Sequence, residues 1–72
     1  MAFWAVANVA ATAADLAQAR ELYNRTQYEA ALREAEAIRP RTAAAQELVG
    51  QIRFMLGDFK KAVEAFEAAV KM

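Results

Sequence analysis

The sequence predicts an all-α protein, and three observations predict it. The chain of 72 residues contains 20 alanines but only two glycines and one proline, a composition typical of helices. Its apolar residues recur at steps of three and four, and no stretch longer than four residues alternates between apolar and polar. The sequence also matches itself when it is shifted by 31 residues, which is typical of stacked helical units.

The first pair of predicted helices occupies residues 14–41. Thr12 and Asp15 have the spacing of a helix start, so a helix is expected from about residue 13 to Arg25; the alternative is that this helix continues directly from the apolar segment before it. Thr26 and Glu29 have the spacing of a capping box and predict the start of the second helix, which ends before Pro40. The residues expected to face inward from this pair are Leu16, Ala19, Leu22, Tyr23, Tyr28, Ala31, Leu32, Ala35 and Ile38.

The second pair of predicted helices occupies residues 42–72. Thr42 is expected to cap its first helix, Gly57 to end that helix in a left-handed conformation, and Asp58 to cap the last helix. The third predicted helix has apolar positions at Ala45, Leu48, Val49, Ile52, Phe54 and Leu56. The fourth predicted helix has them at Phe59, Ala62, Val63, Phe66, Ala69 and Val70.

Residues 1–13 form a separate apolar segment, because every charge lies between Asp15 and Lys71. As a helix this segment is too short to cross a bilayer. One interpretation is a helix that packs on and caps the rest of the chain. Another is the remnant of a secretory signal or anchor, since residues 11–13 are small-x-small, although no basic residue precedes them. The localisation is cytoplasmic by default, and exported or envelope-associated under the second interpretation; membrane contact is expected only through residues 1–14.

The 31-residue shift pairs residues of the same kind. Tyr23 aligns with Phe54, Tyr28 with Phe59, Ala31 with Ala62, Leu32 with Val63 and Ala19 with Gly50. The second copy carries Gly57-Asp58-Phe59 followed by Ala62, Phe66 and Ala69, and in this run it resembles the tetratricopeptide repeat. The resemblance covers about residues 14–72. It implies two stacked antiparallel helical hairpins, a fragment of a right-handed α-solenoid. Ala35, Gln46 and Arg53 stand where that family prefers aromatic residues.

The composition argues against most chemistry. The chain has no Cys, His or Ser, which removes thiol, serine and histidine catalysis and the usual zinc ligands. Its nine basic and nine acidic residues balance, so it lacks the positive field of a nucleic-acid-binding protein. We expect no enzyme activity, no cofactor and no metal.

The resemblance implies a surface that binds a peptide or helix of a partner protein. In the family this groove is lined by the first helix of each repeat. Here that surface is expected to consist of Leu16, Arg20, Tyr23, Asn24, Glu47, Gln51, Phe54 and Met55. The alternative is that these residues only pack the hairpins together. Two other functions stay open: a structural subunit of an envelope complex tethered by the apolar N-terminus, and a designed or truncated helical protein without a native ligand.

Self-association is the last expectation. Two repeats are fewer than the usual minimum of about three, so apolar stacking faces remain at the ends. The zero net charge adds little repulsion between copies. We therefore expect a homodimer, and the residues expected to contribute are Phe3, Trp4, Val63, Phe66 and Val70.

Overall fold

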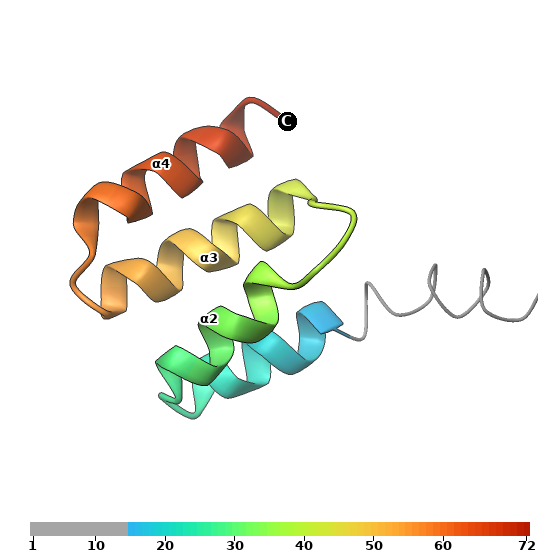
Figure 1. The fold of residues 1–72 in the computed structure, drawn as a ribbon, viewed down its shortest axis with the longest axis vertical. Helices are drawn as coiled ribbons and strands as arrows, with labels where there is room; N and C mark the ends of the chain where they lie inside the picture. Colours follow the sequence, from blue (N-terminus) through green and yellow to red (C-terminus); the bar gives the residue numbers. More distant parts are fainter. Residues whose placement is uncertain (1–14) are drawn as a thin grey trace, which may run out of the picture.

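The computed structural model describes residues 15–72 and contains only helices and their connections (Figure 1). Residues 15–24 are helical, and they are followed by α2 (Tyr28–Glu36), α3 (Ala43–Met55) and α4 (Phe59–Val70). No strand occurs within residues 15–72, which confirms the all-α class. The predictions for Thr12, for Phe3 and Trp4, and for the apolar N-terminal segment lie outside the described residues.

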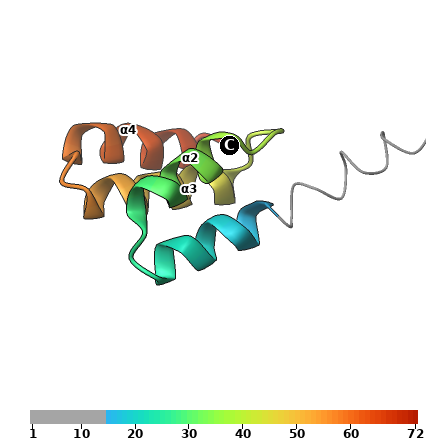
Figure 2. The same ribbon diagram turned by 60° about the horizontal axis from the view of Figure 1, so that its bottom comes forward.

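The helices are arranged so that α3 lies between α4 and α2, and helix 15–24 lies beside α2 (Figures 1 and 2). A connection of three residues, 56–58, joins α3 to α4. The core is built mainly from small side chains, which let the helices approach closely, with larger aliphatic residues from α3 between them. The buried cluster consists of Ala19, Ala31, Ala35, Leu48, Val49, Ile52 and Ala65, and thus draws on all four helices.

The turn after helix 15–24 has a left-handed residue. Thr26 has φ of 61°, its backbone N–H donates to the carbonyl of Tyr23 at 2.9 Å, and the N–H of Gln27 donates to the carbonyl of Leu22 at 2.9 Å. This pair of bonds is the Schellman arrangement, which satisfies the last free carbonyls of a helix.

The turn after α3 repeats that geometry 31 residues later. Gly57 has φ of 84°, and its N–H donates to the carbonyl of Phe54 at 3.0 Å. The N–H of Asp58 donates to the carbonyl of Arg53 at 2.9 Å. The left-handed glycine at residue 57 is confirmed. So are the two predicted N-caps of the second pair, because Thr42 accepts from the N–H of Ala45 and Asp58 accepts from that of Lys61.

The capping box predicted at Thr26 is wrong. The residue before α2 is Gln27, and no side chain caps this helix. The Thr26 hydroxyl donates to the carbonyl of Arg25 instead. Thr26 takes the left-handed conformation that ends the preceding helix, and an N-cap needs a different backbone conformation. The internal repeat does indicate the left-handed conformation of Thr26, because the shift that aligns Tyr23 with Phe54 also aligns Thr26 with Gly57.

The expected burial of several apolar positions is also wrong. Ala62 is buried, and Phe66 and Ala69 are partly buried. By contrast, Phe54, Leu56, Phe59, Val63 and Val70 are exposed. Helical spacing identifies one apolar side of α4, but this side is wider than the area that α3 covers.

Exchanging the residues of the two turns is expected to change stability in opposite directions. Gly57→Thr should destabilise the protein by about 1–2 kcal/mol, because a β-branched residue is strained at positive φ. A Cβ atom at Gly57 meets nothing within 4 Å, so the loss reports backbone strain alone. Thr26→Gly should stabilise the protein by about 1 kcal/mol, since it relieves the same strain. Urea unfolding followed by circular dichroism measures both, and two changes of the same sign would contradict the equivalence of the turns.

Candidate functional site

Each turn is flanked by a pair of aromatic rings at equivalent positions. The ring centroids of Tyr23 and Tyr28 are 5.7 Å apart with planes inclined by 54°. Those of Phe54 and Phe59 are 5.1 Å apart with planes inclined by 65°. The phenylalanine pair is edge-to-face and the tyrosine pair is tilted, and contacts at these ring separations are favourable for aromatic side chains. The two helix pairs therefore share turn geometry, ring packing and the 31-residue offset.

The two helix pairs differ in how much of their apolar surface other helices cover. Tyr23, Tyr28 and Leu32 are partly buried and pack on the core. Their equivalents in the second pair are 54% exposed at Phe54, 57% at Phe59 and 53% at Val63. In the first pair α3 packs against α2, whereas no further helix within residues 15–72 packs on the outer side of α4. The α4 face, as it is called below, is formed by Phe59, Val63 and Val70, which are exposed, and by Phe66, which is partly buried.

Two shallow hollows adjoin the α4 face. One of about 380 Å³ is lined by Val63, Phe66, Glu67, Val70 and Lys71. The other, of about 390 Å³, is lined by Ala43, Ala44, Glu47, Phe66, Ala69 and Val70, and lies between the start of α3 and the end of α4. Both are open and share Phe66 and Val70, so they are parts of one apolar surface. Such a surface suits a packed side chain of another protein better than a small polar substrate.

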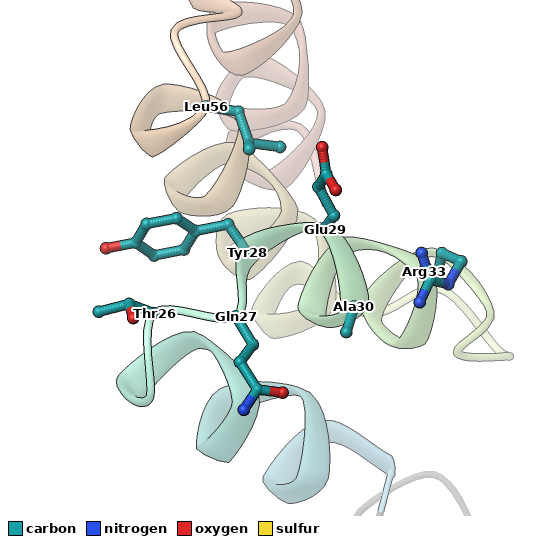
Figure 3. Close-up of a pocket in the computed structure, with 7 residues that line it drawn as sticks. All are labelled: Thr26, Gln27, Tyr28, Glu29, Ala30, Arg33 and Leu56. Carbon is teal, nitrogen blue, oxygen red and sulfur yellow. The ribbon is translucent and has the colours of Figure 1, made fainter.

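A third hollow, of about 450 Å³, lies where α2 begins (Figure 3). It is lined by Thr26, Gln27, Tyr28, Glu29, Ala30, Arg33 and Leu56. Figure 3 shows its polar side chains spread along the turn and along α2 rather than converging on one point. Its two charged residues, Glu29 and Arg33, are exposed to solvent. The arrangement provides no nucleophile held beside a base, which general acid–base or covalent catalysis requires.

The eight predicted groove residues lie on two helices. Leu16, Arg20, Tyr23 and Asn24 belong to helix 15–24, and Glu47, Gln51, Phe54 and Met55 belong to α3. Leu16, Tyr23 and Gln51 are partly buried and the other five are exposed. Tyr23 and Phe54 each contact an aromatic ring of their own helix pair. Whether the two sets act as one surface stays a prediction.

Arg53 joins three helices, and sequence reasoning gave it no such role. Its guanidinium forms an ion pair with Glu36 at the end of α2 and another with Asp58 before α4, the latter with Nη1 and Oδ2 3.4 Å apart. The Arg53 side chain is 19% exposed, so these pairs are partly shielded from water. The sequence feature that marks this position is a departure from the resemblance, because Arg53 stands where the tetratricopeptide repeat prefers an aromatic residue.

Two further arginines stabilise the end of α2. Arg39 donates to the carbonyls of Glu36 at 2.8 Å and Ile38 at 2.7 Å. Arg41 donates to the carbonyl of Ala35 at 3.0 Å and to Oε1 of Gln46 at 3.1 Å. Cations at the carboxyl end of a helix are favourable because the free carbonyls there carry partial negative charge. These arginines therefore act within the fold.

Residues 15–72 contain no group of three or more acidic residues placed to hold a metal ion. Every buried side-chain nitrogen or oxygen in this part of the chain has a hydrogen-bond partner. None of the helices described is both long enough and apolar enough to cross a membrane.

Comparison with known proteins adds no relative. No protein-family model, no curated protein and no solved structure matches the chain.

Proposed function

We propose that the chain is a non-catalytic protein–protein interaction module built from two stacked tetratricopeptide-like hairpins. The observation that supports this most is the repeated unit. Two helix pairs offset by 31 residues share the left-handed turn residue, the hydrogen bonds around it and the ring pair beside it. Repeats of this kind stack side by side and present extended surfaces to other proteins.

The surface proposed to take the partner runs along helix 15–24 and α3. Phe54 and Met55 are 54% and 49% exposed, and Glu47 and Gln51 lie on the same helix. Exposed aromatic and methionine side chains provide apolar contact area, and amide and carboxylate groups provide hydrogen bonds. This mixture suits a helical or extended peptide segment.

Peptide selection with the full chain tests the proposal. Peptides selected from a random display library should bind with measurable affinity, and Phe54→Ala should weaken them at least about tenfold, as loss of an aromatic anchor does. The matched control is Gln18→Ala, which removes an exposed side chain of helix 15–24 outside the predicted groove. Equal affinities for both variants, or no selectable peptide at all, would contradict the proposed groove.

A further inference from the structure

The α4 face has the spacing of a helix–helix seam. Phe59, Val63, Phe66 and Val70 follow one another at steps of four, three and four, the pattern of the two apolar positions of a heptad. Ala62 and Ala65 are buried against the rest of the chain, and the row lies beside them on α4, with Phe66 partly buried against Gly50 of α3. Val63 is 53% and Val70 86% exposed. A row of this kind is stable when a second helix packs along it.

We propose that the α4 face binds the α4 face of a second copy of this chain, with the two helices antiparallel about a two-fold axis. This inference rests on α4, whereas the peptide groove rests on helix 15–24 and α3, and the two surfaces meet at Phe54. In the antiparallel arrangement Val63 meets Phe66 of the partner subunit and Phe59 meets Val70 of the partner subunit. Each contact occurs twice because of the symmetry.

The outer side of helix 15–24 argues against head-to-tail stacking through this helix. The 31-residue shift makes helix 15–24 the equivalent of α3, so a head-to-tail neighbour would place this helix on α4. At the positions where α3 has Leu48, Val49 and Ile52, helix 15–24 has Ala17, Gln18 and Glu21, and all three are exposed. Within residues 15–72, this outer side offers too little apolar surface to cover the α4 face. A two-fold pair buries the apolar row on both copies at once.

The charges beside the row favour the antiparallel direction. Lys60 and Glu67 are seven residues apart and flank the row on one side. Antiparallel pairing brings Lys60 next to Glu67 of the partner subunit, and the symmetry repeats the pair. In a parallel pair, a flanking residue of one helix faces the residue five positions earlier in the other helix. For Glu67 that residue is Ala62, so no ion pair forms.

The apolar area is continued at both ends of α4. Phe54 packs on Phe59 at the start of the helix, and Met72 is 61% exposed beyond its end. Antiparallel pairing joins these two ends, which extends a row that is itself about 18 Å long. Ala43 and Ala44 at the start of α3 add only small side chains beside it. An interface of about 600–800 Å² per chain, at the lower end of stable dimers, fits this surface.

Sedimentation velocity of the full chain tests the dimer. The chain of 7.9 kDa should sediment as a dimer at micromolar to submillimolar concentration, and Val63→Glu should make it monomeric. Val63 is exposed, so the helical circular dichroism of this variant should stay that of the original chain. Gln18→Glu, at the opposite end, is the matched control and should leave the dimer intact.

Charge reversal tests the direction of pairing. Lys60→Glu alone and Glu67→Lys alone should each weaken dimerisation roughly tenfold, and the double variant should restore it. A double variant as weak as either single variant overturns the antiparallel arrangement. The dimer itself is overturned if the original chain is monomeric over the whole concentration range tested. This holds whether residues 1–14 or solvent covers the α4 face in that monomer. It is equally overturned by assemblies that grow beyond a dimer, or by a Val63→Glu chain that remains dimeric.

Discussion

Replacing Ile52 with alanine is expected to leave much of the protein unfolded in water. Ile52 is fully buried in the middle of α3, within the cluster that joins all four helices. Removing its side chain leaves a cavity and should cost about 2–5 kcal/mol. A domain of this size has only a few kcal/mol of stability in total. Urea unfolding followed by circular dichroism, at one fixed protein concentration, measures the loss.

The matched control for this change is Phe54→Ala, two residues further along the same helix. It removes a larger side chain, but one that is 54% exposed. It should therefore cost only about 1 kcal/mol, mainly the contact with the Phe59 ring. A greater loss for Phe54→Ala than for Ile52→Ala would show that the core is not where the structure places it.

Adding a methyl group at Gly50 is expected to change stability in opposite directions on two backgrounds. A Cβ atom at Gly50 would lie 2.6 Å from Cε1 of Phe66, closer than such atoms approach. Gly50→Ala should therefore cost about 1–3 kcal/mol, since the ring must move. In a chain that already carries Phe66→Ala, the same change should stabilise the protein by about 1 kcal/mol, because alanine is the better helix former.

The first helix pair already has alanine at both of the positions that correspond to Gly50 and Phe66. Ala19 and Ala35 occupy the positions equivalent to Gly50 and Phe66, and both are fully buried. Free energies of unfolding of the original chain, both single variants and the double variant give the coupling between the two sites. If Gly50→Ala has the same effect on both backgrounds, the contact between Gly50 and Phe66 is absent in solution.

Local features of the fold could be predicted because they depend on residues close together in sequence. The caps at Thr42 and Asp58 and the left-handed Gly57 follow from what each residue type permits the backbone to do. The N-cap predicted at Thr26 is wrong because threonine is common at N-caps and rare at positive φ. Only its alignment with Gly57 favours the second role.

Features that depend on neighbouring helices could not be predicted in the same way. The ion pair of Arg53 with Glu36 joins two helices across 17 residues of sequence. The exposure of Phe59 and Val63 depends on whether another helix covers α4, and helical spacing alone does not contain this information. The predicted groove stays a prediction for the same reason, because its residues come from two helices that are distant in sequence.

That the two helix pairs are copies of one unit is tested most directly by an NMR measurement of the turn at Thr26. The structure predicts a positive φ at Thr26 and a hydrogen bond from Gln27 to Leu22, matching the bond from Asp58 to Arg53. It also predicts ring contacts between Tyr23 and Tyr28 like those between Phe54 and Phe59. A negative φ at Thr26, with its hydroxyl accepting from the backbone N–H of Glu29, would contradict the two-copy structure.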